Sequence, residues 1–202
     1  MRTVSRKNFE ELRKFNQLSD KEKSKMKGGN FYYDTNGNFL GQIGSGPSLQ
    51  FVDQSTFNQF KSAGFEGTGT SFNNVSQEAK INFIESLWGS SNVIVYPDLR
   101  LPSGALAAAN TDTKELLFAG NAEFWGNYYN IISTIQHEKY HVDNPSLTGA
   151  MGEVYALMYQ RADSSYQNVS TDYRQATDDL LRDQMKNAGY TQSQIDDYFN
   201  SH

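Results

Sequence analysis

Residues 125–141 read WGNYYNIISTIQHEKYH, and this stretch decides the fold. If it is helical, its apolar residues have the spacing of a helix that packs on a hydrophobic core. These residues are Tyr128, Ile131, Ile132 and Ile135, followed by Val142. The opposite face carries polar residues, namely Asn130, Ser133, Thr134, His137 and His141. We therefore predict a long helix from about 125 to 141 that rests on the core with one face and lines a cleft with the other.

The end of this helix carries an HExxH motif, His137-Glu138-Lys139-Tyr140-His141, which contains two of the three histidines in the chain. Side chains four residues apart lie one helical turn apart on the same face, where two imidazoles can bind a single metal ion. Glu138 is then placed to act as a general base toward a metal-bound water. The alternative is a surface helix with two unrelated histidines. The polar face that the histidines extend argues against two satisfied core histidines.

A catalytic zinc ion usually has three protein ligands and a water molecule. We expect Glu153 to be the third ligand, because it lies on the next predicted helix, from about 149 to 161, and a short antiparallel connection returns it toward the histidines. The rival is Asp143, for which the chain would have to fold back sharply, and the terminal His202 is a poor substitute. The alternative for Glu153 is a solvent-facing side chain. Small residues near Glu153 let the two helices pack closely: Gly149, Ala150, Gly152 and Ala156.

The composition narrows the possible classes of protein. At 202 residues the chain has the length of one ordinary domain with an appended segment, and the absence of cysteine excludes disulfides and thiolate metal sites. Residues 1–29 carry nine Lys and Arg against four Asp and Glu, whereas the remainder carries nine against nineteen. An acidic main body argues against nucleic acid as a partner. We expect no transmembrane segment and no secretory signal of the usual kind, because no stretch is apolar enough.

Residues 1–29 form a separate unit. They resemble the double-glycine leader peptides that peptidase-containing transporters remove during export, through Leu18-Ser19, Glu22, Met26 and Gly28-Gly29. This resemblance implies an export transporter that recognises residues 1–29 and a protein delivered outside the producing cell. The alternative is an amphipathic N-terminal helix of a cytoplasmic protein, with its apolar stripe at Phe9, Leu12, Phe15 and Leu18.

The remaining chain divides into residues 30–75, a hairpin and glycine-rich part, and residues 76–202, which carry the HExxH motif. Asn36-Gly37 is a strong signal for a tight turn between two strands. The pattern of apolar residues predicts strands at 31–34, 39–43, 92–96 and 114–119. It predicts further helices at 76–88, 171–188 and 191–199. Together these elements predict an α+β fold.

The HExxH motif with downstream Glu153 resembles the gluzincin clan of zinc metallopeptidases. More narrowly, residues 92–159 are similar to small metallopeptidase-like domains of secreted bacterial effectors and toxins. The resemblance implies a minimal zincin-like fold, in which a small antiparallel sheet packs on the HExxH helix and the glutamate-bearing helix. It implies a Zn²⁺ ion held by His137, His141 and Glu153, with Glu138 as the catalytic base. The substrate would be a peptide or protein aligned along the strand at 114–119.

The predicted function is therefore that of a zinc-dependent metallopeptidase. One alternative is a catalytically inactive metal-binding or interaction domain of a secreted protein, and another is a binding module in which the motif is accidental. Several tyrosines are candidates for stabilising an oxyanion, and the sequence does not choose among Tyr128, Tyr129, Tyr140, Tyr155 and Tyr159. The candidates for accepting a hydrogen bond from the second ring nitrogen of a ligand histidine, and so for orienting it, are Asp98 and Asp143.

Overall fold

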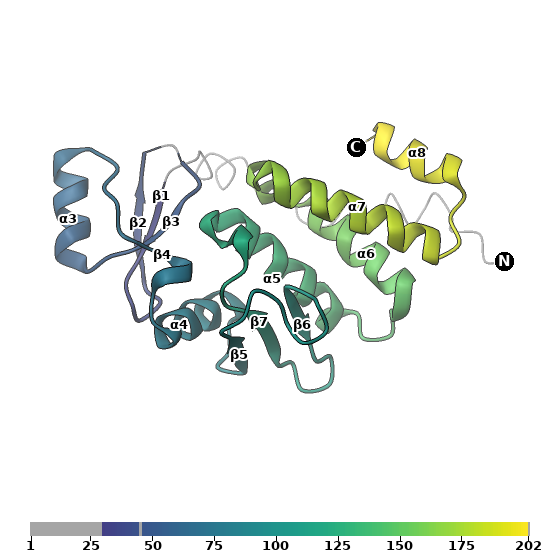
Figure 1. Cartoon of the computed structure of the whole chain (residues 1–202), viewed down its shortest axis with the longest axis horizontal. Coiled ribbons are helices and arrows are strands. Elements are labelled where there is room, and N and C mark those ends of the chain that lie inside the picture. The colour runs from purple at the N-terminus through teal and green to yellow at the C-terminus, as the bar shows by residue number, and fades with distance from the viewer. Residues whose placement is uncertain (1–29, 45, 202) are drawn as a thin grey trace.

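The computed structural model describes residues 30–44 and 46–201. The fold is α+β, as predicted: two small sheets pack with helices, and the histidine-bearing helix is followed by the glutamate-bearing helix (Figure 1). The predictions for residues 1–29, and the terminal His202, lie outside the described residues. Within the described part of the chain, no helix has both the length and the apolar character needed to cross a bilayer.

The first sheet grows around the predicted hairpin. Its strands follow the order β2-β1-β3-β4 and are β2 (Phe39–Ile43), β1 (Asn30–Tyr33), β3 (Leu49–Phe51) and β4 (Thr70–Ser71). β1 and β2 are antiparallel, and the Asp34 carboxylate holds their turn by accepting 2.9 Å hydrogen bonds from the backbone N–H groups of Asn36 and Asn38. Gly37 has a φ of 80°, and a Cβ there would lie 2.5 Å from the carbonyl oxygen of Asn82. The turn therefore requires glycine.

The second sheet has the order β5-β7-β6 and is formed by β5 (Val93–Tyr96), β7 (Leu116–Ala119) and β6 (Ala107–Ala109). β5 and β7 are parallel, whereas β6 and β7 are antiparallel. The sheet is thus mixed and not antiparallel throughout, because the chain forms the outer strand β6 before it returns to place β7 beside β5. Since β7 is paired on both edges, it cannot align an extended substrate, contrary to our expectation for residues 114–119. Both neighbours of β7 are edge strands of this sheet, β5 on the parallel side and β6 on the antiparallel side.

The helices are α3 (Gln54–Ala63), α4 (Gln77–Trp88), α5 (Tyr128–Asp143), α6 (Gly149–Ala162), α7 (Thr171–Asn187) and α8 (Gln192–Ser201). Short 3-10 helices precede or follow them at η1 (Phe72–Asn74), η2 (Glu123–Gly126) and η3 (Ser164–Asn168). Of the six α-helices, all but α3 were predicted, and none of the 3-10 helices was. α5 begins later than expected because residues 123–126 form η2 and the Asn127 side chain caps the helix, accepting a 2.8 Å hydrogen bond from the Tyr129 N–H. In Figure 1, α5 lies between the first sheet and helices α6, α7 and α8.

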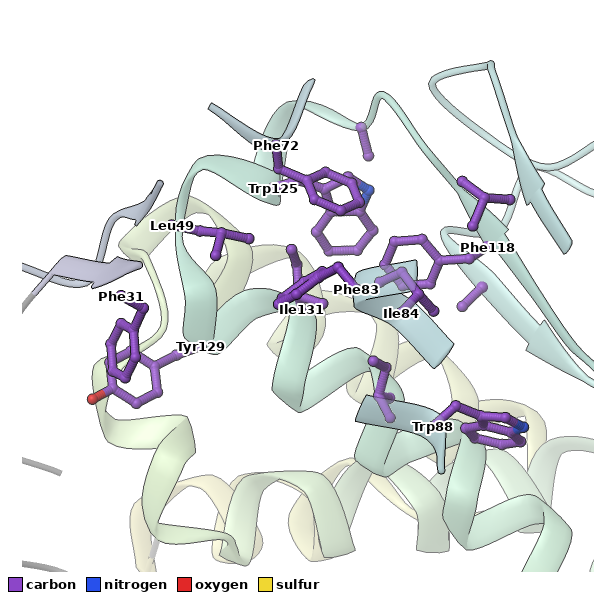
Figure 2. Packing of buried hydrophobic residues seen from close by; sticks show 14 of the residues in the cluster. Phe31, Leu49, Phe72, Phe83, Ile84, Trp88, Phe118, Trp125, Tyr129 and Ile131 are labelled. Carbon is purple, nitrogen blue, oxygen red and sulfur yellow. The ribbon is translucent and has the colours of Figure 1, made fainter. Parts of the chain in front are cut away.

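Two hydrophobic clusters hold these layers together. The larger joins both sheets to α4 and α5 (Figure 2), and its members include Phe31, Leu49, Phe83, Phe118 and Trp125. The smaller joins α6, α7 and α8 through Val154, Leu157, Leu181, Met185 and Ile195. Each large apolar side chain that is fully buried contributes about 1.5–3 kcal/mol to the stability of the fold. The two clusters therefore hold α5 and α6 in place and support the residues between these helices.

Helix α5 is buried on both faces. Ile131 and Ile135 pack in the larger cluster, as predicted. The polar face was expected to line a cleft, yet Asn130, Ser133 and Thr134 are also buried. They are covered by α6 and α7, with which they form hydrogen bonds such as the one from Asn130 Nδ2 to Ser170 Oγ at 2.9 Å. Of this face, Thr134, His137 and His141 line a cavity.

Candidate metal centre

The connection between α5 and α6 returns Glu153 to the histidines. The backbone N–H of Asn144 donates to the carbonyl of His141 at 3.2 Å and so ends α5, and the N–H of Leu147 donates to the carbonyl of Asn144 at 2.9 Å. A Cβ on Gly152 would lie 2.4 Å from the carbonyl oxygen of Leu147. The close approach of the chain at Gly152 therefore requires a residue without a side chain, and it sets Glu153 opposite α5.

The three predicted ligands converge on one point. The Nε2 atoms of His137 and His141 are 3.1 Å apart, and each lies 3.3 Å from a different carboxylate oxygen of Glu153. This confirms the expected juxtaposition. Among residues 30–44 and 46–201, these are the only three His, Asp or Glu side chains grouped closely enough to hold a metal ion together. The rival Asp143 does not belong to the group.

The donor set and its dimensions fit a zinc ion. Two ligand atoms that each lie about 2.1 Å from a tetrahedral zinc ion are about 3.4 Å apart. The two Nε2 atoms are 3.1 Å apart, which is close to this separation, and with one ligand atom taken from each residue the three atoms lie within 4.8 Å of one another. Two imidazole nitrogens and one carboxylate are also a donor set that zinc uses in hydrolytic enzymes. The three side chains thus form a group that could hold a metal ion.

Glu138 lies beside the triad but is not part of it. Its side chain is buried, and its Oε2 atom accepts a 2.9 Å hydrogen bond from the backbone N–H of Ala109 on β6. Burial raises the pKa of Glu138, an effect that the nearby charges of His137 and His141 reduce. The result is a carboxylate that is more basic than usual, held at a fixed distance from the sheet.

His137 and Glu153 stabilise each other's charged forms. Burial alone would lower the pKa of His137, but the hydrogen bond to Glu153 and the charges of Glu153 and Glu138 raise it overall. Burial alone would raise the pKa of Glu153, but hydrogen bonds from His137 and His141 hold it well below its usual range. Glu153 is therefore ionised at neutral pH, which is the state that binds a metal ion.

A cavity of about 610 Å³ opens in front of these residues. One part of its wall is formed by His137, Glu138, His141 and Glu153. Another part is formed by residues 104–109, which include strand β6. The remaining wall combines the apolar side chains of Phe124, Leu147, Leu157, Ala176 and Leu180 with polar side chains, which are four threonines, Gln160 and Tyr173. Among the described residues, no Lys, Arg or Asp lines the cavity.

The tyrosines proposed from the sequence do not line this cavity. Tyr128 and Tyr129 lie in the larger cluster beside Phe31, with ring centroids 4.0 and 5.3 Å from its ring (Figure 2 shows Tyr129 and Phe31). Tyr140, Tyr155 and Tyr159 are absent from the wall, and so are Asp98 and Asp143. The tyrosine that does reach the cavity is Tyr173 of α7, which the sequence did not single out.

Sequence reasoning also missed Gln160. It follows Glu153 by two helical turns on the same face of α6, and this spacing is the one signal that was available. Its buried amide lines the cavity and donates 2.9 and 3.0 Å hydrogen bonds to Ser133 and Tyr173. Tyr173 carried no comparable signal, because its place depends on how α7 packs across α5.

The chain matches no protein-family model, and no curated protein or solved structure matches it significantly. The function is therefore inferred from the geometry and chemistry of this site.

Proposed function

We propose that this protein is a zinc-dependent peptidase that hydrolyses peptide bonds. The observation that carries the proposal is the convergence of His137 Nε2, His141 Nε2 and the Glu153 carboxylate, whose ligand atoms lie within 4.8 Å of one another. A fourth side chain, the buried Glu138 carboxylate, shares the cavity wall with them. A site that only bound a structural metal ion would not need this carboxylate.

The roles of the side chains follow from their positions. A bound zinc ion would polarise the substrate carbonyl and lower the pKa of a water molecule. Glu138 accepts the proton of that water and passes it to the leaving amine. Because the Ala109 N–H occupies Oε2, the Oε1 atom is the one that takes the proton. Burial raises the pKa of Glu138 toward the value at which a general base is most effective near neutral pH.

The edge of β6 is suited to align an extended peptide. In an antiparallel ladder, the N–H and C=O groups of successive residues point alternately toward the partner strand and away from it. The N–H of Ala109 points away from β7 to Glu138, so the polar groups of Ala107, two residues earlier, point the same way. A substrate strand that adds to this edge would place its backbone beside the metal ligands.

The cavity wall favours substrates with an apolar side chain near the bond that is cleaved. Leu147, Leu157 and Leu180 offer apolar contact, and no cationic side chain is present among the described lining residues to bind an acidic substrate. Each apolar side chain that enters the cavity adds binding energy in proportion to the area it buries, about 25 cal/mol per Å².

Metal content and cleavage, measured together, test the proposal. The full chain is purified without chelator, and its metal content is determined by elemental analysis. It is then incubated with a peptide library, and cleavage is followed by mass spectrometry with and without a chelator. We expect about one zinc ion per chain and cleavage that the chelator abolishes. Bound zinc without cleavage of any peptide would favour the inactive metal-binding domain, and the absence of any bound metal would refute the site.

Export remains a proposal that depends on residues 1–29. The support for it is their resemblance to double-glycine leaders, through Leu18-Ser19 and Gly28-Gly29. N-terminal sequencing of protein recovered from the medium of the producing cell tests it, with Asn30 as the expected first residue.

A further inference from the structure

The outer edge of β6 presents backbone polar groups to the cavity. Just after this strand, the backbone N–H of Asn110 donates to the carbonyl of Glu115 at 2.9 Å, toward the β7 side. Because bonding directions alternate along an antiparallel strand, Ala107 and Ala109 direct their N–H and C=O groups away from β7. The hydrogen bond from Ala109 to Glu138 agrees with this direction and shows that the outer edge faces the HExxH helix α5.

Ala107 can bind a further backbone at this edge. It lines the cavity and is 6 % exposed. Among the residues that the structure describes, none donates to its outward C=O or accepts from its outward N–H. Buried backbone groups ordinarily have a hydrogen-bond partner, and the backbone of a bound peptide supplies one for each of these groups. At Ala109 only the C=O is available, because the N–H already donates to Glu138.

A turn closes the edge at the beginning of β6. The N–H of Leu101 donates to the carbonyl of Ala105 at 2.9 Å, and the N–H of Gly104 donates to the carbonyl of Leu101 at 2.8 Å. Gly104 and Ala105 belong to the cavity wall, and Leu101 is 4 % exposed, so the turn packs against the protein. A peptide strand paired with Ala107 therefore cannot continue past residues 101–105.

The contact between Ala109 and Glu138 indicates which bond of such a peptide is cleaved. Antiparallel pairing is the more stable arrangement for an added strand. The substrate residue opposite Ala109 then donates its N–H to the Ala109 carbonyl, and its own carbonyl lies beside the N–H that Glu138 occupies. This carbonyl is next to the general base, so the bond that follows it is cleaved. The second residue after that bond lies opposite Ala107.

We propose that the site releases short carboxyl-terminal fragments from extended peptides. This inference rests on the proposed function and names its substrate class. With a rise of about 3.4 Å per residue, about two or three residues fit between the cleaved bond and the turn at 101–105. A terminal dipeptide is favoured, because its last residue forms both hydrogen bonds with Ala107. Water supplies the hydroxyl of the new carboxylate on the shortened peptide, and Glu138 passes the proton to the amine of the released fragment.

The lengths of the products test the proposal. The full chain is incubated with synthetic peptides of increasing length that carry apolar residues near the carboxyl end, and the products are identified by mass spectrometry. At every peptide length we expect the first cut to remove about two or three carboxyl-terminal residues. A head-to-tail cyclic form of the same peptide should stay intact. Cleavage of the cyclic form, first cuts at the amino end, or first carboxyl-terminal products longer than three residues would overturn the proposal and leave the peptidase function standing. Cleavage of no peptide at all would refute both.

Gly104→Val tests the role of the turn. Gly104 has a φ of 86°, which a β-branched residue rarely adopts, so the turn should open and longer carboxyl-terminal fragments should appear. Gly89→Val is the matched control, with a φ of 88° and, like Gly104, no atom within 4 Å of an added Cβ. Its products should have the wild-type lengths. Wild-type lengths in a folded Gly104→Val would overturn the role of the turn, and if that variant does not fold, the product lengths of the wild type still decide the proposal.

Discussion

The backbone N–H of Ala109 donates to the Glu138 carboxylate over 2.9 Å, which ties the edge strand β6 to the HExxH helix α5. The same hydrogen bond joins the proposed general base to the strand edge that faces the cavity. In the proposed peptidase, substrate alignment and proton transfer would therefore be coupled through this one contact.

Glu138→Gln should retain zinc and lose peptide hydrolysis. The amide oxygen can still accept from the Ala109 N–H, but the side chain can no longer take a proton, so we expect a loss of about 10²–10⁴-fold in kcat. Metal content by elemental analysis and cleavage rates on one peptide provide the measurement. Glu78→Gln, at an exposed position on α4, is the control. Undiminished hydrolysis in Glu138→Gln would show that a different base operates.

Gly152→Ala should weaken both the fold and zinc binding. The new Cβ would lie 2.4 Å from the Leu147 carbonyl oxygen, so the connection between α5 and α6 must shift and carry Glu153 with it. Overpacking of this kind costs about 1–3 kcal/mol. Thermal melting and a zinc titration measure the two effects. Gly126→Ala is the matched control, because a Cβ there meets no atom within 4 Å. Equal behaviour of the two variants would contradict the proposed role of this close approach.

In the metal-free protein, the contribution of Glu153 to the stability of the fold should depend on pH. The pKa of Glu153 is lowered, so its contribution to stability is present above the unfolded value of about 4.3 and is lost as the pH falls through the folded value. The pKa of His137 is raised, so its contribution is present below about 6.5 and is lost as the pH rises through the folded value. The two windows overlap between about pH 4.3 and 6.5.

We therefore expect the difference in melting temperature between the wild type and Glu153→Gln, both in chelator, to be largest in this window. Melting curves across the pH range measure it. A difference that grows steadily above pH 7 would have the wrong sign for this ion pair.

Leu180→Asp should impair the cleavage of apolar peptides without unfolding the protein. Leu180 lines the cavity and is 45 % exposed, so a charge there is solvated but repels an apolar side chain from the cavity. We expect a raised KM and an unchanged melting temperature. Leu99→Asp, at a residue that is 58 % exposed and outside the cavity wall, is the control. A KM that changes equally in both variants would exclude this part of the cavity from substrate binding.

A chain that begins at Asn30 should melt at the same temperature as the full chain and bind zinc equally well. The reason is that the metal triad and the described members of both hydrophobic clusters lie after residue 29, and a leader would not be needed to hold them together. Thermal melting and zinc titration of the two chains provide the measurement. A large drop in melting temperature on truncation would rule out a simple leader and favour a structural role for Phe9, Leu12, Phe15 and Leu18.

The sequence predicted the parts of the site that depend on local periodicity. The spacing of His137 and His141, and the short return to Glu153, follow from the geometry of one helical hairpin. The place of Tyr173 and the edge position of β6 depend on contacts between distant segments, which no single helix or strand pattern reports. The burial of Ser133 and Thr134 was missed for the same reason, because α6 and α7 supply the cover that turns a polar face into an interior one.

The closeness of Gly152 to the Leu147 carbonyl has a consequence for the order of folding. Because one tight helical hairpin supplies all three proposed metal ligands, the site depends on contacts that are near in sequence, and such contacts are expected to form early. In the mixed sheet, the parallel pairing of β5 with β7 joins residues that are farther apart in sequence, such as Val93 and Leu116, and is expected to form later. A zinc ion captured by residues 137–153 would then act during folding as a template, on which the edge strand docks when Ala109 reaches Glu138.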